Sequence, residues 1–228
     1  MSLEFRDILI RQGDFALRAD LTVPPGRHAV IGASGSGKST LLSLIGGYLA
    51  PERGQVVWQG RDITAMAPGK RPVSTLFQSH NLFPHLTVAQ NVGMGLRPDL
   101  RLDRAQSMAV EAVLDRVGLA GTGARRPGDL SGGQQSRVAL ARVLLRARPL
   151  LLLDEPFAAL GPALKADMLA LLAEVAGDAT VLMVTHDPAD ARTFAPTTLL
   201  IEDGLVHPPR PTGPLLDNPP PGLRAYLG

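Results

Sequence analysis

The chain contains 228 residues, 45% hydrophobic and 19% charged, so it can bury the core of one large domain, with or without an inserted subdomain, and is not disordered throughout. Its formal net charge is +2 and it contains no run of five or six like charges, which gives no support to a nucleic-acid partner. It has no cysteine, which excludes disulfides, thiolate metal sites and cysteine nucleophiles.

The N-terminal residues favour a cytoplasmic protein. Glu4, Arg6 and Asp7 are charged where a signal peptide needs an apolar stretch. The most apolar runs, residues 150–153 and 181–184, are far shorter than the roughly 20 residues that span a bilayer. We therefore expect any membrane role to be peripheral.

The first part of the chain reads as strands followed by a loop and a helix. Residues 15–23 alternate apolar and polar side chains, as in a half-buried antiparallel strand, and residues 28–31 predict a short buried strand before a glycine-rich loop. The apolar residues after Lys38 predict a buried helix that ends at Gly46 and Gly47.

The later elements predict a parallel sheet with a helical insertion. Strands are expected at residues 56–58 and 73–77, and strand signals then disappear from residue 88 to residue 146. Strands return at residues 150–153 and 180–185, with an amphipathic helix between them. Strand, helix and strand in this order indicate a parallel sheet and an α/β fold.

The domain boundaries follow from these patterns. We expect one domain over residues 1–206 with a helical subdomain inserted at about 85–146. The tail, residues 207–228, holds seven of the 20 prolines, which predicts an extended or weakly ordered segment.

A phosphate-binding loop follows the predicted strand at residues 28–31. The pattern G-x-x-x-x-G-K-S has the strand before it and the helix after it that the motif requires, so a simple glycine-rich turn is the weaker reading. Its glycines aim backbone N–H groups at phosphate oxygens, its lysine reaches the β- and γ-phosphates, and its last serine coordinates magnesium. The nucleotide-binding residues are Gly32, Ala33, Ser34, Gly35, Ser36, Gly37, Lys38, Ser39 and Thr40.

Two carboxylates end the strand at residues 150–153, where α/β proteins place ligands. Asp154 is suited to holding magnesium through water, and Glu155 is suited to accepting the proton of an attacking water. A solvated acidic strand end is the alternative, and the phosphate-binding loop makes it the less favoured one.

Two polar residues follow other strands at the same predicted edge. Gln78 comes after residues 73–77, and its amide is able to bond a magnesium-bound water or the nucleophile. His186 comes after residues 181–184, which places its imidazole near the γ-phosphate, although a lone histidine is more often structural.

The sequence Leu130-Ser131-Gly132-Gly133-Gln134 predicts a second phosphate-facing surface. Ser131 and Gln134 have the spacing of a helix capping box. Capping leaves the two glycines unexplained, because each costs up to about 1 kcal/mol in a helix relative to alanine. Close approach of a phosphate to their bare N–H groups supplies a reason.

Together these residues resemble a family. The phosphate-binding loop, Gln78, residues 130–134, the pair Asp154 and Glu155, and His186 have the order and rough spacing of the ATP-binding subunits of ABC transporters. The resemblance covers residues 3–206. It implies a P-loop ABC ATPase fold with a mixed, largely parallel core sheet, a small antiparallel β subdomain and an inserted α-helical subdomain.

The resemblance also implies ATP and Mg²⁺ as cofactors and a second copy of the chain as partner. Two copies would face head to tail, with each ATP between the phosphate-binding loop of one and Ser131 and Gly133 of the other. Hydrolysis would then release the dimer. In the implied site Lys38, Gln78, Glu155 and His186 surround the phosphates, Ser39, Gln78 and Asp154 hold the metal, and Ser131, Gly132, Gly133 and Gln134 bind nucleotide across the dimer.

A narrower resemblance concerns the transported substrate. Residues 71–78 and 81–91 look like the ATPases of bacterial thiamine importers, and related importers of iron(III), polyamines or sulfate share much of this segment. The implied partners are integral membrane permease subunits and, indirectly, a periplasmic substrate-binding protein. The implied location is the cytoplasmic face of the bacterial inner membrane. Leu82, Phe83 and His85 are candidates for contact with the permease; an apolar loop packed within its own subunit is the alternative.

Two positions depart from the family pattern. Gly161 stands where the family usually has an aspartate that couples the facing ATP sites, which predicts weaker coupling or slower hydrolysis. The aromatic residue that stacks on adenine is missing near residues 10–12. Phe15 is the nearest substitute, although its place in an alternating strand favours core packing.

Two rivals to the importer ATPase remain. A soluble ABC ATPase acting on DNA or ribosomes would require a long coiled-coil insertion or a tandem second cassette, and the sequence has neither. A weakly hydrolysing nucleotide-binding partner in a heterodimer is the other rival, prompted by Gly161.

Overall fold

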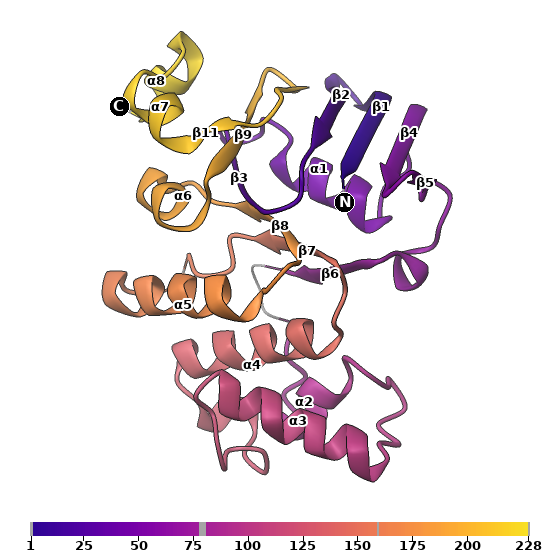
Figure 1. Ribbon diagram of the computed structural model, residues 1–228, viewed down its shortest axis with the longest axis vertical. Helices are drawn as coiled ribbons and strands as arrows, with labels where there is room; N and C mark the ends of the chain where they lie inside the picture. The colour runs from indigo at the N-terminus through magenta and orange to yellow at the C-terminus, as the bar shows by residue number, and fades with distance from the viewer. Residues whose placement is uncertain (1, 78–80, 159, 228) are drawn as a thin grey trace.

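The computed structural model describes residues 2–77, 81–158 and 160–227. These residues form one long mixed sheet with helices on its faces and a helical segment at one end (Figure 1). The strand order is β5-β4-β1-β2-β10-β9-β3-β8-β7-β6, and β11 pairs with β9.

One half of the sheet is antiparallel. Its strands are β1 (Leu3–Gln12), β2 (Phe15–Val23), β4 (Arg53–Trp58) and β5 (Arg61–Asp62). β1 pairs antiparallel with both β2 and β4. Alternate residues of β2 are buried, as the period-two pattern predicts. The predicted antiparallel strand is therefore confirmed.

The other half is parallel and contains the strands that end at the candidate site. They are β3 (Arg27–Ile31), β6 (Val73–Leu76), β7 (Leu150–Asp154), β8 (Thr180–Val184) and β9 (Thr197–Glu202), while β10 (Leu205–Val206) links the two halves. β6, β7, β8, β3 and β9 pair parallel in that order. The first four residues of β7 are buried, which explains its run of leucines.

Helices on the sheet faces connect these strands. They are α1 (Lys38–Gly46), α5 (Pro162–Val175) and α6 (Pro188–Phe194). Gly47 caps α1 with a φ of 83°, so the predicted end of this helix is confirmed.

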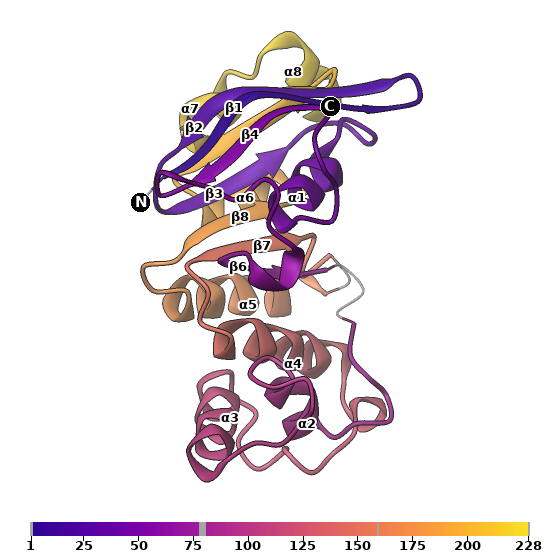
Figure 2. The same ribbon diagram turned by 90° about the vertical axis from the view of Figure 1, so that its right-hand side faces the viewer.

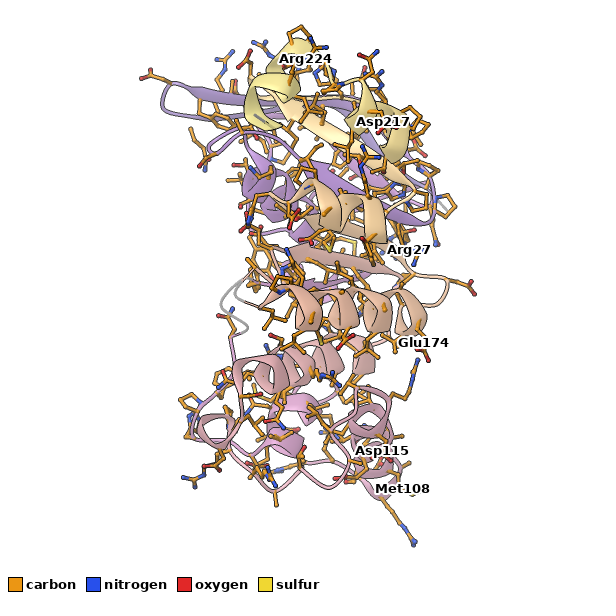
Figure 3. All side chains as sticks on the ribbon, turned by 90° about the vertical axis from the view of Figure 1, so that its left-hand side faces the viewer. Arg27, Met108, Asp115, Glu174, Asp217 and Arg224 are labelled. Atoms are coloured by element: carbon orange, nitrogen blue, oxygen red, sulfur yellow. The ribbon has the colours of Figure 1, made fainter. Side chains whose placement is uncertain are left out.

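The helical segment lies at the end of the molecule away from the antiparallel strands (Figure 2). It contains α2 (Val88–Gly93), α3 (Arg104–Arg116) and α4 (Gly132–Leu145), with a short 3₁₀ turn at Pro127–Asp129 before α4. Another 3₁₀ turn, Pro68–Lys70, precedes β6 outside this segment. Ten buried apolar residues form a separate core for the helical segment: Val88, Val92, Val110, Val113, Leu114, Val117, Leu119, Leu130, Val138 and Ala141. Met108 of α3, 64% exposed, lies near the lower end of the molecule (Figure 3).

The expectation of an extended or weakly ordered tail was wrong. Residues 210–227 form β11 (Arg210–Pro211), α7 (Thr212–Asp217) and α8 (Pro221–Leu227). Leu215, Leu216 and Leu223 are buried in the same apolar cluster as β7 and β8. Burial of these leucines anchors the tail, and Pro221 is the first residue of α8, where proline is favoured.

In the described part of the chain, none of the helices combines the length and the apolar character needed to cross a bilayer.

Candidate functional site

The phosphate-binding loop connects the end of β3 to the start of α1. Gly35 and Gly37 have φ values of 77° and 110°, in the region that favours glycine. A Cβ on Gly37 would lie 2.7 Å from atoms of Phe15 and Leu17, so both backbone conformation and close packing require glycine there. Gly37 is also the N-cap of α1, so the loop delivers backbone N–H groups at a helix N-terminus.

Lys38 places its ammonium group at this loop. Its Nζ donates to the carbonyl oxygens of Gly32 and Ala33, both at 2.8 Å. Burial lowers the pKa of Lys38, and the nearby Glu155 and Asp154 carboxylates act in the opposite direction. A cavity of about 270 Å³ opens here, lined by Phe15, Ser34, Gly35, Gly37, Lys38, Ser39, Thr40 and Glu155.

Asp154 ends β7 beside this cavity. Burial raises the pKa of its carboxyl group, while a hydrogen bond with the side chain of Ser39 lowers it. Carboxylate and hydroxyl oxygens are the donors that Mg²⁺ takes from proteins, usually together with phosphate oxygens and water. The donor set that the sequence predicted is therefore brought together for two of its three members, Ser39 and Asp154.

Glu155 and His186 meet at the same edge of the sheet. Asp154 pairs with Val184, so the residues that follow β7 and β8 are neighbours. His186 Nδ1 lies 3.3 Å from Glu155 Oε2, and the two side chains are 58% and 24% exposed. Glu155 has a φ of 44°, which is uncommon for a residue other than glycine, and its N–H donates to the Val184 carbonyl. Backbone held in such a conformation concentrates at functional sites.

Gln78, the remaining predicted residue, lies outside the described residues. Phe77 before it packs edge to face against Tyr48, the residue after the cap of α1, with ring centroids 5.7 Å apart.

Residues 130–134 lie elsewhere, at the N-terminus of α4. The capping box is present: Ser131 accepts from the Gln134 N–H at 3.3 Å, and the Gln134 side chain accepts from the Ser131 N–H at 3.0 Å. Gln134 therefore caps the N-terminus of α4. Ser131 and Gly132 are exposed, and neither is among the described residues that line the cavity of the phosphate-binding loop.

The two glycines of α4 have different surroundings. A Cβ on Gly133 would lie 2.3 Å from Leu164 Cδ2 of α5, so packing within the chain already favours glycine there. A Cβ on Gly132 would meet nothing within 4 Å. Packing within the chain therefore gives no reason for glycine at position 132, and the N–H groups of both glycines have no partner within the helix.

Comparison with known proteins decides the family. A sequence model described as "ABC transporter" matches residues 17–158, more than half of the chain. The chain belongs to the ABC transporter family. The predicted family and fold are confirmed.

Individual relatives of this ABC protein match over nearly their whole length. A "Thiamine import ATP-binding protein ThiQ" of Cereibacter sphaeroides is 62% identical over 97% of both chains. The proteins of that name from a Ruegeria species and from Yersinia pestis are 55% and 50% identical, over 99% and 87% of this chain and 99% and 85% of theirs. A dimeric structure of the ATP-binding cassette MJ0796, bound to ADP and Pi, is 27% identical with a TM-score of 0.77, over 92% of this chain and 98% of that chain.

Phe15, the substitute for the missing ABC aromatic, has two environments. It is half-buried and packs against the core of the antiparallel half of the sheet, as its place in β2 predicted. It also lines the cavity of the phosphate-binding loop and a neighbouring cavity of about 570 Å³. Its ring is therefore available to a nucleotide as well as to the core.

Gly161, the second departure from the ABC pattern, is the N-cap of α5. Its φ of −64° and ψ of 158° suit any residue, and a Cβ there would meet nothing within 4 Å. Neither backbone nor packing requires glycine at this position, so an aspartate fits without rearrangement.

Sequence reasoning missed the contacts of two cations, Arg71 at the far end of α1 and Lys165 near His186. Arg71 is 1% exposed and donates to carbonyl oxygens at the end of α1 and in the segment before β6, including Leu44 O at 2.7 Å and Thr64 O at 2.6 Å. Lys165 on α5 contacts two carboxylates close to His186. The contact of Arg71 with Leu44 spans 27 residues and that of Lys165 with Asp187 spans 22, so no local pattern signals them.

Proposed function

We propose that this chain is the ATP-hydrolysing subunit of a bacterial importer, that it dimerises on ATP, and that it powers uptake of thiamine through separate membrane subunits. One observation supports the hydrolytic part: Lys38 and Glu155 line the cavity at the phosphate-binding loop, and His186 lies in contact with Glu155. The names of the relatives carry the choice of thiamine.

The residues divide the work of phosphoryl transfer to water. The N–H groups at the start of α1 and the Lys38 ammonium bind and neutralise the β- and γ-phosphates. Glu155 accepts the proton of the attacking water, and His186, in contact with Glu155, orients the γ-phosphate and that water. Ser39 and Asp154, with Gln78, would hold Mg²⁺, which supplies charge neutralisation between the phosphates.

The second half of each ATP site comes from another copy of the chain. The start of α4 exposes Ser131 and the Gly132 N–H away from the chain's own phosphate-binding cavity. An exposed helix N-terminus with an uncapped N–H fits an anionic phosphate. The dimeric state of MJ0796 supports the same arrangement here.

Permease subunits would dock on the loop before α2 and on the groove beside it. The buried Asn91 fixes this loop, accepting from the Phe83 N–H at 2.8 Å and donating to the carbonyls of Phe83 and Thr87, both at 3.0 Å. Phe83 and His85 are exposed and stack edge to face, whereas Leu82 packs into the chain's own core. The permease contact therefore rests on Phe83 and His85.

The adjoining groove has the chemistry for an amphipathic permease segment. It has a volume of about 610 Å³ and lies between β6, the loop after α2 and the end of α4. Met94, Leu96 and Pro98 supply apolar surface, and Arg142, Arg146 and Arg148 supply cations. Docking there places the chain at the cytoplasmic face of the inner membrane, and a periplasmic binding protein acts on the opposite side of the permease.

Uptake by the assembled transporter tests this function. The chain is purified with its permease subunits, reconstituted in vesicles with internal ATP and Mg²⁺, and supplied with labelled thiamine and its binding protein. We expect ATP-dependent thiamine uptake and none of iron(III), polyamine or sulfate. Uptake of iron(III), polyamine or sulfate instead would show that thiamine is not the substrate. ATP hydrolysis without any uptake would favour a non-transport ATPase.

Phe15 is expected to contact the nucleotide base. Phe15→Ala removes a ring worth roughly 1–3 kcal/mol when it stacks on a base, so the KM for ATP should rise about tenfold with kcat little changed. Steady-state ATPase kinetics measure this. Inhibition by inorganic triphosphate is the control, because it has no base: weaker inhibition would show that the substitution distorts the loop near Gly37 instead.

Gly161 is expected to slow hydrolysis. Gly161→Asp restores a carboxylate in a position with open space, so the ATPase rate or the Hill coefficient for ATP in the assembled transporter should rise, while thermal stability changes by a few tenths of a kcal/mol. Gly161→Asn is the uncharged control. An unchanged rate and Hill coefficient would contradict the coupling role. A negligible rate in the natural chain with a large gain in the variant would favour the weakly hydrolysing partner.

A further inference from the structure

Lys165 joins two acidic residues of α6 to the start of α5. Its Nζ lies 2.6 Å from Asp187 Oδ2 and 3.0 Å from Asp190 Oδ1. The side chains of Lys165 and Asp190 are 18% and 14% exposed, and that of Asp187 is 33% exposed, so solvent screens this group less than it screens a surface ion pair. The hydrogen bond with Asp187 raises the pKa of Lys165, which keeps the cation charged.

The two carboxylates hold the residues on either side of His186. Asp190 Oδ2 accepts from the buried Thr185 hydroxyl at 3.1 Å, and the Asp187 N–H donates to Thr185 Oγ1 at 3.0 Å. Asp187 also caps α6, accepting from the Ala189 N–H at 2.9 Å. His186 is itself 58% exposed, so the direction of its ring depends strongly on the backbone that these contacts fix.

Lys165 lies in the first turn of α5, directly after the loop that carries Glu155. Its N–H donates to the Gly161 carbonyl at 2.9 Å in the first turn of α5. Within the described residues of this loop, Ala158 N–H donates to the Glu155 carbonyl and Leu160 N–H to the Phe157 carbonyl. Lys165 thus connects the helix that follows the Glu155 loop to the residues that follow β8, in addition to the contact between Glu155 and His186.

We propose that Lys165 is a positioning residue for hydrolysis, which holds His186 in register with Glu155 through Asp187 and Asp190. The inference rests on the proposed hydrolytic function. It also connects the segment around Gly161 to His186 without the aspartate that the family usually has at position 161. Movement of the first turn of α5 moves Lys165 and, with it, Asp187 and Asp190.

The geometry explains why a cation is needed there. Asp187 and Asp190 lie close together at the start of one short helix, and the ammonium group between them offsets their repulsion. Without it the carboxylates separate, and Thr185 and the backbone of His186 move with them. A small displacement of a catalytic group costs up to a hundredfold in rate without weakening substrate binding.

The test uses the full chain and three substitutions. Lys165→Met keeps much of the aliphatic stem and removes the charge, and Lys165→Arg keeps the charge. Arg192→Met is the matched control, because it breaks another ion pair of α6, between Arg192 and Asp217. Asp217 lies on the side of the molecule away from α1 (Figure 3). ATPase kinetics, thermal denaturation and the imidazole NMR signals of His186 are recorded for each.

Lys165→Met should lower kcat about tenfold to a hundredfold, change the KM for ATP less than about twofold, and shift the His186 signals. Lys165→Arg should keep most of the rate, and Arg192→Met all of it. The proposal is overturned if Lys165→Met lowers thermal stability without lowering kcat, if Arg192→Met lowers kcat equally, or if the His186 signals stay in place. A natural chain that binds ATP without hydrolysing it would instead refute the proposed function.

Discussion

Glu155→Gln should reduce the ATPase rate by about a hundredfold or more while ATP still binds. The amide has nearly the shape of the carboxylate and still reaches His186, but it has lost the basicity needed to accept a proton from water, a step worth 10²–10⁴-fold. Because hydrolysis no longer separates the two copies, a stable dimer should accumulate in the presence of ATP. Phosphate release measures the first effect, and size-exclusion chromatography with ATP and Mg²⁺ measures the second.

Glu174→Gln is the control for this prediction. Glu174 is an exposed acid of α5, on the side of the molecule away from α1 (Figure 3), and its substitution should leave both the rate and the dimer unchanged. Equal and negligible phosphate release by the natural chain and by Glu155→Gln would remove the claim that this chain is an enzyme. A loss of ATP binding in Glu155→Gln would contradict the role of Glu155 as base.

The part of the site made by parallel strands could be predicted from the sequence because one rule governs it. Adjacent parallel strands end at the same edge, so Asp154, Glu155 and His186 had to be neighbours once β7 and β8 were recognised. The phosphate-binding loop was predictable for a similar reason, since its glycines, lysine and serine act through local backbone geometry.

The contacts that depend on packing were not predictable in this way. Leu164 against Gly133 joins two helices distant in sequence, and the Lys165 contacts join α5 to α6. Proline content misled the prediction for the tail, because proline disfavours a helix interior but is well placed in the first turn, as Pro221 is in α8. The apolar residues Leu215, Leu216 and Leu223 were the signal that this segment packs on the core.

If each ATP site combines the phosphate-binding loop of one copy with the start of α4 of another, two different inactive variants should restore ATPase activity when they are mixed. Lys38→Ala removes the ammonium group from the phosphate-binding loop, and Gly132→Asp places a carboxylate where the facing phosphate would approach. Open space around Gly132 and the helix N-terminus make this aspartate harmless to the isolated chain, with a gain of about 0.3–1 kcal/mol for α4. In the assembled transporter, where the permease subunits hold two copies together, each variant alone should therefore fold without hydrolysing ATP.

Mixing the two variants in equal amounts should restore about a quarter of the natural rate. Random pairing makes half of the dimers mixed, and in a head-to-tail dimer each mixed pair has one site free of both substitutions. Gly161 lacks the carboxylate that the family usually has at this position, which favours sites that act independently, so one intact site should work alone. If instead each chain completed its own site, every site in the mixture would be defective and no activity would return.

A second mixture distinguishes the two arrangements even when the paired sites must act together. A chain carrying both Lys38→Ala and Gly132→Asp is mixed equally with the natural chain. Across a head-to-tail dimer each mixed pair has a substitution in both sites, so only natural pairs work and about a quarter of the rate remains. Sites within single chains would keep about half. Measuring phosphate release in both mixtures thus determines whether the exposed start of α4 serves its own phosphate-binding loop or that of a second copy.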